Sequence, residues 1–369
     1  MRLALSGGGT GGHVYPALSI AAALDDELPQ GDDLELLYVG SEGGAEDALV
    51  GRSGISFAKI ASAPIRGRMP WQMAASAAQI ALGVRQGRSL IDEFRPAAML
   101  STGGYASFPL SLAARTRRVP IALYLPDLRP GWAVRAIAKL AKRIAVSAAE
   151  SLRQLPGGKT QVTGYPVRSE FWTANRDGGR ERLGLNSEEK VLYVAGASQG
   201  AHSINRAVAA DISGLLELCE VVHLCGPADE AWLQEVRDGL SDGQRERYQL
   251  FGYMHEDTPW AMAAADLAVC RSGASVIGEL PAVGLPAVLV PYPHAGGHQR
   301  TNAHYMEIKG AAVVMDDDDL KTMLPVVGEL LYDEGRLREM REASRKLARP
   351  DAASRIARIL LDLAVENPS

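Results

Sequence analysis

Short apolar runs alternate with longer helical patterns along the chain, and this alternation constrains the fold most. The first half contains runs such as "RLAL", "LELLYV" and "IALY", and a second series starts near residue 190 with "VLYVAG", "LAVC" and "PAVLVP". Apolar runs of this length between helical segments predict βαβ units and parallel sheets. Because the series begins twice, we expect an α/β fold. It should have two Rossmann-like, doubly wound parallel-sheet domains that face each other across a ligand-binding cleft.

The domain boundaries follow from the two series and from the composition between them. Expected strands are 2–5, 34–39, 97–100, 121–124, 143–147, 191–196, 219–226, 248–252, 267–270, 286–291 and 311–315, with helices over 16–28 and 131–142. A stretch rich in Gly, Pro and polar residues separates the series and is typical of a linker. We therefore expect a first domain over 1–164, a linker over 165–186, a second domain over 187–345 and a closing amphipathic helix over 346–369.

Charge and composition exclude several classes of protein. The chain has 369 residues, of which 47% are hydrophobic and 22% charged, as in soluble globular proteins of two domains. The net charge of −5 argues against a nucleic-acid binder. Residues 1–164 nevertheless carry 18 Lys and Arg against 13 Asp and Glu, so the first half is the part that suits an anionic partner. Cys219, Cys225 and Cys270 form no C-x-x-C pair and are expected to be small buried residues of a reduced, cytosolic protein.

Four glycine-rich turns fall at predicted strand-to-helix junctions. They read "SGGGTGGH" (6–13), "STGGYASFP" (101–109), "AGASQGA" (195–201) and "CRSGAS" (270–275). Glycine lets the backbone approach an anion, and the start of the following helix supplies free N–H groups. Four such turns over two sheets indicate a ligand with phosphates. A dinucleotide-dependent oxidoreductase is a remote alternative, because the expected acidic residue about 20 positions beyond the glycines is missing.

Two side chains stand out beside these turns. His13 directly follows the first turn, where a neutral imidazole can accept a proton at physiological pH, although such a histidine can also be a simple helix cap. Glu279 is expected one turn into a helix that begins near Gly273, where its carboxylate can accept hydrogen bonds from two sugar hydroxyls. The spacing of His294, His298 and His304 fits no zinc motif, and we expect no metal site.

The loops "GGTGGHVYPALSIAAAL", "STGGYASFP", "GASQGA", "CRSGASVIGE" and "HQRTNA" resemble the family 28 glycosyltransferases of bacterial peptidoglycan synthesis over essentially the whole chain. The resemblance implies a GT-B fold with the acceptor domain first and the UDP-sugar domain second. It implies inverting transfer of N-acetylglucosamine from UDP-GlcNAc to the 4-hydroxyl of a lipid-linked muramyl-pentapeptide, without metal or other cofactor. Related enzymes with another lipid or small-molecule acceptor, and a catalytically silent sugar-nucleotide sensor, remain alternatives.

The resemblance also implies roles for individual residues on the donor side. Glu279 would hold the ribose, Ser198 a phosphate, and Gln299 the sugar hydroxyls, while Tyr253 and Met254 would meet the uracil. The full set implied to bind the donor is Thr10, Gly11, Gly12, Asp127, Arg168, Ser198, Tyr253, Met254, Ala274, Ser275, Val276, Ile277, Gly278, Glu279, His298 and Gln299.

On the acceptor side, the resemblance implies that Gly104, Tyr105 and Ser107 help to bind the diphosphate and that His13 faces the reaction centre, where we expect it to be the general base. This chain has "YLPDLRPG" where the family typically has "HEQN" before "PG", so Asp127 is a rival base.

A basic and apolar stretch in the first half points to a membrane. It contains Arg66, Arg68, Trp71, Arg85 and Arg88. Cations beside apolar side chains suit peripheral contact with anionic lipids, here at the cytoplasmic face of the cell membrane. An ordinary amphipathic helix with a solvated face is the alternative.

Overall fold

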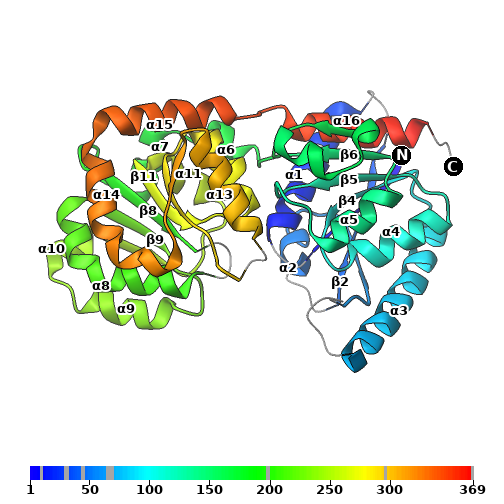
Figure 1. Cartoon of the computed structure of the whole chain (residues 1–369), viewed down its shortest axis with the longest axis horizontal. Helices are drawn as coiled ribbons and strands as arrows, with labels where there is room; N and C mark the ends of the chain where they lie inside the picture. Colours follow the sequence, from blue (N-terminus) through cyan, green and yellow to red (C-terminus); the bar gives the residue numbers. More distant parts are fainter. Residues whose placement is uncertain are drawn as a thin grey trace. The chain divides into compact units, whose positions relative to one another are not determined.

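The structure of this chain is a computed structural model that describes residues 1–8, 11–28, 33–42, 46–63, 70–196, 200–294 and 297–366, with only the backbone of 70–72. It divides into two compact units, one made of Met1–Arg168 with Arg349–Ser369 and the other of Ser169–Ala348 (Figure 1). Each unit is an α/β structure around one parallel sheet, which confirms the fold class expected from the sequence.

The first unit contains a seven-stranded parallel sheet in the order β3-β2-β1-β4-β5-β6-β7. Its strands are β1 (Arg2–Gly7), β2 (Glu35–Ser41), β3 (Ser56–Ile60), β4 (Ala98–Gly103), β5 (Ile121–Leu125), β6 (Arg143–Val146) and β7 (Thr160–Val162). From β1 the chain moves outward to β3 and then returns to β4 beside β1, so the order reverses between β1 and β4. In doubly wound sheets, ligands bind beyond the carboxyl ends of the strands at such a reversal.

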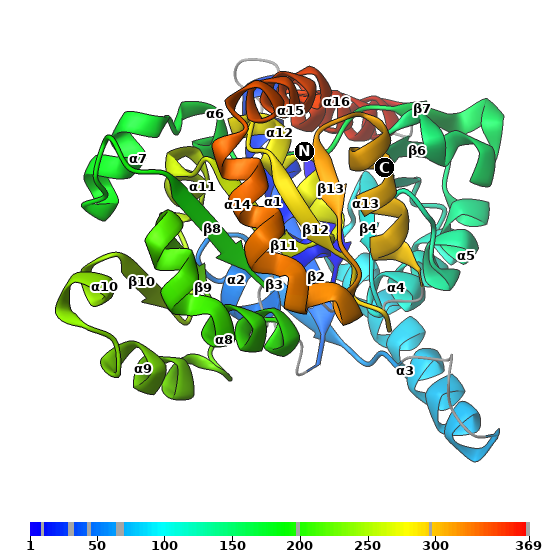
Figure 2. The same ribbon diagram turned by 60° about the vertical axis from the view of Figure 1, so that its left-hand side comes forward.

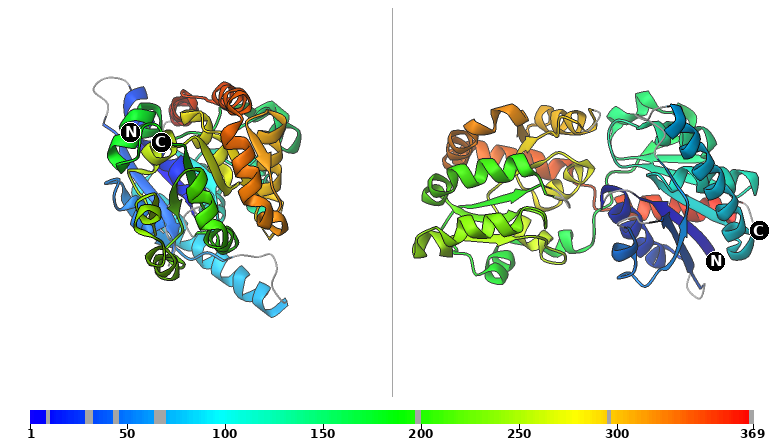
Figure 3. Two further views of the ribbon diagram at one scale, coloured as in Figure 1. Left: turned by 90° about the vertical axis from the view of Figure 1, so that its left-hand side faces the viewer. Right: turned by 90° about the horizontal axis from the view of Figure 1, so that it is seen from below.

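Alternating side chains on these buried strands form two separate hydrophobic cores. Leu3 and Leu5 pack with α1 (Gly11–Glu27) and α16 (Ala352–Val365) on one face of the sheet. Ala4 points to the opposite face and joins the core under α4 (Ser107–Thr116) and α5 (Trp132–Leu140). Because both faces of the sheet are buried, the strands read as continuous apolar runs. The C-terminal helix α16 packs directly against α1, so the end of the chain completes the first unit (Figure 3).

The second unit repeats the plan with a six-stranded parallel sheet in the order β10-β9-β8-β11-β12-β13. Its strands are β8 (Val191–Ala195), β9 (Glu220–Leu224), β10 (Tyr248–Phe251), β11 (Leu267–Arg271), β12 (Ala287–Val290) and β13 (Ala312–Val314). Helices α8 (His202–Leu218) and α14 (Met323–Tyr332) cover one face, as Figure 2 shows, and α11 (Thr258–Ala264) lies on the other face with α7 (Arg176–Leu183). The order reverses between β8 and β11, which defines a second switch point.

The remaining helices connect or flank these layers. They are α2 (Glu46–Val50), α3 (Pro70–Phe94), α6 (Glu170–Thr173), α9 (Glu230–Asp238), α10 (Asp242–Glu246), α12 (Glu279–Val283), α13 (His298–Ile308) and α15 (Glu334–Leu347), with 3-10 turns η1 (Ala149–Gln154), η2 (Gly157–Lys159), η3 (Ala274–Ile277) and η4 (Asp317–Thr322). Among the described residues, none of the helices combines the length and the apolar character that crossing a membrane requires.

Every strand expected from the sequence is present, and two further strands occur. The additional strands β3 and β7 are short and lie at opposite edges of the first sheet. Helix α1 begins at Gly11, five residues before the expected start, and includes Pro16. The segment 165–186, expected to be a linker, contains α6 and α7, which belong to the second unit.

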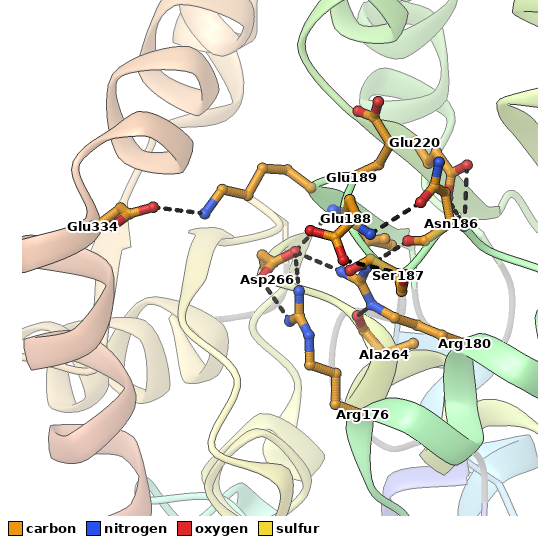
Figure 4. A network of polar contacts seen from close by, with 12 residues as sticks. Arg176, Arg180, Asn186, Ser187, Glu188, Glu189, Glu220, Ala264, Asp266 and Glu334 are labelled. Carbon is orange, nitrogen blue, oxygen red and sulfur yellow. Dashed lines mark hydrogen bonds and ion pairs between the residues drawn. The ribbon is translucent and has the colours of Figure 1, made fainter.

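A buried ion-pair network attaches α7 to the amino ends of strands β8 and β11 of the second sheet (Figure 4). Asp266, just before β11, accepts hydrogen bonds from Arg180 Nη2 at 3.1 Å, Arg176 Nη1 at 2.6 Å and the backbone N–H of Val191 at 3.0 Å. Arg180 also donates to the carbonyl oxygens of Asn186 and Ser187 at 2.6 and 2.7 Å. The side chains of Asp266 and Arg180 are only 5% and 4% exposed, so the pair is shielded from water.

Candidate functional site

His13 lies in the first turn of α1, at the switch point of the first sheet. Its Nδ1 atom is 2.7 Å from the carbonyl oxygen of Thr102, and Thr102 Oγ1 donates to the His13 carbonyl oxygen at 2.7 Å. A carbonyl oxygen only accepts hydrogen bonds, so Nδ1 carries the hydrogen. In the neutral ring Nε2 then has the lone pair, which is the state that a general base requires.

The second glycine turn packs against the first one, backbone to backbone. Gly103 and Gly104 have φ values of +94° and +93°, and the N–H of Gly8 donates to the Gly103 carbonyl oxygen at 3.3 Å. A Cβ atom at position 104 would lie 2.2 Å from the Gly8 carbonyl oxygen. Positive φ and this close approach both require glycine. Gly8, Gly103 and Gly104 therefore form one closely packed, rigid edge beyond β1 and β4.

Tyr105 and Ser107, both implied to bind the acceptor, lie differently. Ser107 is fully buried, and its Oγ is 2.7 Å from the Gly103 carbonyl oxygen and 3.1 Å from Ser6 Oγ. This hydroxyl therefore stabilises the glycine turn from its buried side. The side chain of Tyr105 is 51% exposed and is available to a ligand.

Asp127 follows β5, the strand next to β4, and is half-buried. The carbonyl oxygens of its two neighbours are fixed, because Ser147 Oγ donates to Pro126 at 2.7 Å and Ser151 Oγ donates to Leu128 at 3.0 Å. His13, Tyr105 and Asp127 thus follow three adjacent strands at one edge of the sheet. This placement keeps both candidate bases on the same edge.

Arg168 is the last residue of the first unit. The carbon of its guanidinium group lies 5.0 Å from the centre of the Tyr15 ring, on α1. Stacking of this kind orients the planar guanidinium group. Arg168 therefore stands beside the helix that carries His13.

In the second unit, the segment after β11 forms the 3-10 turn η3, and Glu279 begins α12. Ala274, Val276, Ile277 and Gly278 are buried, and Glu279 is half-buried, as is Ser275. Contacts from Val276 and Ile277 to a ligand would therefore come from the backbone. The carboxylate of Glu279 and the hydroxyl of Ser275 are the side-chain groups of this segment that a ligand can reach.

Gln299 in the first turn of α13 is held in a defined orientation. Its Oε1 accepts the backbone N–H of Tyr292 at 2.9 Å, so its Nε2 is the end of the amide left to donate to a ligand. Ser272 Oγ donates to the Gln299 carbonyl oxygen at 2.9 Å, and Asn302 Nδ2 donates to the Ser272 carbonyl oxygen at 3.1 Å. These bonds join α13 to the loop after β11. His298, half-buried, is the first residue of α13.

The residues expected to meet a base lie in the loop after β10. Tyr253 is half-buried and its ring centre is 4.3 Å from that of His255. Met254 is buried, and its carbonyl oxygen accepts a hydrogen bond from Thr258 Oγ1 at 3.0 Å. This bond fixes the backbone at the start of α11.

Sequence reasoning missed a buried arginine that joins the elements around the second switch point. Arg271, the last residue of β11, donates to Asp317 Oδ1 at 2.5 Å and to Ser203 Oγ at 2.6 Å. Ser203 Oγ in turn donates to Asp317 at 2.8 Å. The arrangement ties the first turn of α8 to η4 and β11. The only local signal in the sequence is an arginine directly before a glycine turn.

Several expected site residues lie outside the described residues or on the surface. Thr10, Ser198, Arg66 and Arg68 and the side chain of Trp71 are outside the described part; Gly11 and Gly12 open α1. Arg85 and Arg88 are exposed on α3, the helix that projects from the first unit (Figure 1). Met73 and Leu82 on the same helix are exposed as well. This part of the stretch therefore combines cations with exposed apolar side chains.

The three cysteines are buried, and the described residues contain no cluster of side chains that could bind a metal ion. All three cysteines are buried, as expected, and burial raises the pKa of Cys219 and Cys270 to about 12 and that of Cys225 to about 11. Such thiols are not reactive nucleophiles at neutral pH. Within the described ranges, no three or more His, Cys, Asp or Glu side chains are grouped to hold a metal ion.

Comparison with known proteins gives matches over both units. Residues 3–146 match the model of the glycosyltransferase family 28 N-terminal domain, and residues 191–356 match that of the family 28 C-terminal domain. The chain is 42% identical to a protein of Roseiflexus sp. (strain RS-1), covering 99% of this chain and 95% of the relative. It is 38% identical to a protein of Moorella thermoacetica, covering 98% of both. Both relatives are named UDP-N-acetylglucosamine–N-acetylmuramyl-(pentapeptide) pyrophosphoryl-undecaprenol N-acetylglucosamine transferase.

Solved structures share the fold. The crystal structure of Acinetobacter baumannii MurG aligns with a TM-score of 0.74 at 23% identity, covering 98% of this chain and 99% of that one. The UDP-GlcNAc 2-epimerase of Neisseria meningitidis, bound to UDP-GlcNAc, aligns with a TM-score of 0.71 at 13% identity, covering 98% of this chain and all of that one (100%).

Proposed function

The chain belongs to glycosyltransferase family 28, and from this membership we propose that it transfers N-acetylglucosamine from UDP-GlcNAc to a lipid-linked muramyl-pentapeptide. The acceptor atom is the 4-hydroxyl of the muramyl sugar. One observation carries the proposal: a relative with this named activity is 42% identical over 99% of the chain. The glycine turns and polar side chains at both switch points support it, because each edge has groups that suit phosphates and sugars.

For the donor, we assign the second unit. Glu279 accepts hydrogen bonds from the ribose hydroxyls, and Gln299 donates its Nε2–H to a hydroxyl of the transferred sugar. As the bond between the anomeric carbon and the β-phosphate oxygen breaks, its electron pair moves to that oxygen. Backbone N–H groups at the start of α8 and in η3 stabilise the resulting charge, and we propose that no metal is needed.

For the acceptor, we assign the first unit. Tyr105 and the rigid edge formed by Gly8, Gly103 and Gly104 contact the acceptor diphosphate. His13 Nε2 removes the proton of the 4-hydroxyl while the oxygen attacks the anomeric carbon in line, so the configuration inverts. Thr102 keeps Nδ1 protonated and thereby keeps Nε2 as the accepting atom. Asp127 is the rival base from the same edge.

Release of UDP tests the proposed function. Purified protein with UDP-GlcNAc should release UDP rapidly when the muramyl-pentapeptide lipid is added, and only slowly without it. Rapid release with diacylglycerol or simple alcohols instead would favour an enzyme with another acceptor. UDP-GlcNAc binding without release would favour a sensor, and tight NAD(P) binding without UDP binding would favour an oxidoreductase. Loss of activity in EDTA would contradict the metal-free mechanism.

We predict that Glu279→Ala weakens UDP binding about 10- to 100-fold, because hydrogen bonds to a charged group are each worth about 1.5–3 kcal/mol. Titration calorimetry with UDP and 2′-deoxy-UDP checks the assignment to the ribose. The wild type should prefer UDP, and the variant should lose most of this preference. Glu329→Ala, which removes an exposed carboxylate of α14, is the control. It should change neither the affinity for UDP nor that for 2′-deoxy-UDP. An unchanged preference in Glu279→Ala would remove the ribose role.

We further propose that α3 contacts anionic membrane lipids at the cytoplasmic face of the membrane. Each arginine near such a surface contributes about 1 kcal/mol, so Arg85→Glu with Arg88→Glu should weaken binding to anionic vesicles at least about tenfold. Vesicle sedimentation at low and high salt measures this, since salt screens the attraction. Arg52→Glu with Arg153→Glu reverses two exposed charges elsewhere on the first unit and should have little effect. Equal losses for both pairs would show that net charge, not α3, governs binding.

A further inference from the structure

His202, the first residue of α8, forms a hydrogen-bonded pair with Asp229, which lies in the loop after β9. His202 Nδ1 is 2.9 Å from Asp229 Oδ1, and the His202 side chain is 66% exposed. Gly200, two residues before α8, packs against the residue that follows β9, because a Cβ atom at Gly200 would lie 2.2 Å from the Cys225 carbonyl oxygen. The imidazole therefore has a defined place beside the carboxyl ends of β8 and β9.

Asp229, which binds His202, is itself fixed by further hydrogen bonds. It is buried, and it also accepts hydrogen bonds from Asn205 Nδ2 at 2.7 Å and Trp232 Nε1 at 2.8 Å. Burial alone would raise the pKa of Asp229, but the hydrogen bonds from Trp232, His202 and Asn205 outweigh burial and lower it. The carboxylate thus stays ionised and accepts the hydrogen of Nδ1. The other ring nitrogen, Nε2, is left for a ligand.

The support of Asp229 continues into the core. Asn205 Oδ1 lies 3.0 Å from His223 Nε2, and His223 Nδ1 lies 2.9 Å from Tyr248 Oη. Burial lowers the pKa of His223 to about 3, so this ring stays neutral and acts only as a hydrogen-bonding link. A chain of buried groups from β10 through β9 to α8 therefore fixes an exposed imidazole.

The charges on the two flanks of the first turn of α8 differ. On the flank toward β11, the positive charge of Arg271 is neutralised by Asp317, and Arg271 also donates a hydrogen bond to Ser203 Oγ. On the flank toward β9, the imidazole exposes Nε2, which donates a hydrogen bond when the ring is protonated. An anion at the N-terminus of α8 would meet both this donor and the partial positive charge of a helix of 17 residues.

We propose that His202, oriented by Asp229, donates a hydrogen bond from Nε2 to the diphosphate of the donor nucleotide. The inference rests on the proposed function. The imidazolium donates a hydrogen bond and transfers no proton. When the bond between sugar and β-phosphate breaks, the electron pair stays on the phosphate oxygen and the interaction becomes stronger. Asp229 is a positioning residue, because it acts only through the ring.

Titration calorimetry with UDP and uridine at pH 6, just below the usual pKa of imidazole of about 6.5, tests the proposal. His202→Ala should weaken UDP binding about 10- to 100-fold and leave uridine binding unchanged. His202→Arg, which restores a cation, should regain most of the affinity, and Asp229→Asn should show an intermediate loss confined to UDP. His304→Ala is a matched control, since His304 is also 66% exposed and bound to a carboxylate, Glu307, at 3.2 Å.

Several results would contradict the role assigned to His202. UDP binding by His202→Ala within twofold of the wild type would overturn the proposal, as would equal losses for UDP and uridine or a similar loss in His304→Ala. Failure of His202→Arg to recover affinity would also contradict it. If the wild type itself does not bind UDP, the proposed function fails, and that result is distinct from a failure of the His202 assignment.

Discussion

Replacing His13 with alanine is expected to lower kcat by about 10²–10⁴, the usual contribution of a general base, while the Kd for UDP stays at the wild-type value. The separation follows from the structure, because His13 belongs to the first unit and the proposed UDP contact of Glu279 belongs to the second. Single-turnover kinetics with the lipid acceptor, together with calorimetry for UDP, measures both quantities.

Two further variants distinguish the rival bases. Asp127→Asn keeps the size of the side chain and should retain most of the turnover if His13 is the base. Thr102→Val removes the Oγ1 hydrogen bond to the His13 carbonyl oxygen but keeps the backbone acceptor of Nδ1, so it should cost less than His13→Ala. Near-wild-type turnover in His13→Ala combined with a large loss in Asp127→Asn would transfer the role to Asp127.

Replacing Asp266 with alanine is expected to lower the free energy of unfolding by about 3–5 kcal/mol, because it leaves the buried guanidinium of Arg180 without its charge partner. The backbone N–H of Val191 loses its acceptor as well. Denaturant unfolding monitored by circular dichroism measures the change. Because α7 is then less firmly attached, we expect the second unit to unfold at a lower denaturant concentration than in the wild type.

The control for Asp266 is an exposed ion pair of the same unit. Asp242 is 95% exposed and 2.6 Å from Arg245, so Asp242→Ala should change the stability by less than about 1 kcal/mol. If Asp266→Ala lies within 1 kcal/mol of the wild type, the network in Figure 4 does not hold the unit together in the way described.

The sheet strands could be predicted from the sequence because burial on both faces makes them continuous apolar runs. The edge strands β3 and β7 escaped prediction because they are less buried and therefore lack this apolar signal. "SFAKI" mixes polar and apolar residues without a regular period, and β7 has only three residues, Thr160–Val162. The early start of α1 was hidden by Pro16 and by the glycines before it, which individually disfavour a helix.

The candidate site could be predicted only where a local motif marks it. The glycine turns and Glu279 are local signals, whereas Arg271 with Asp317, and His202 with Asp229, join residues that are far apart in the sequence. Such pairs depend on the strand order, which the sequence pattern does not specify. Ser107 shows the same limit, because only the fold reveals that its hydroxyl faces the core while Tyr105 faces solvent.

The chemical structure of the glycosylated lipid product tests the central claim most directly. The protein is incubated with UDP-GlcNAc and the muramyl-pentapeptide lipid, and the lipid is analysed by mass spectrometry and NMR. The account predicts one added N-acetylglucosamine per acceptor, β-linked to the 4-hydroxyl of the muramyl sugar, with one UDP released for each. Release of UDP with a free sugar and an unchanged lipid would contradict it.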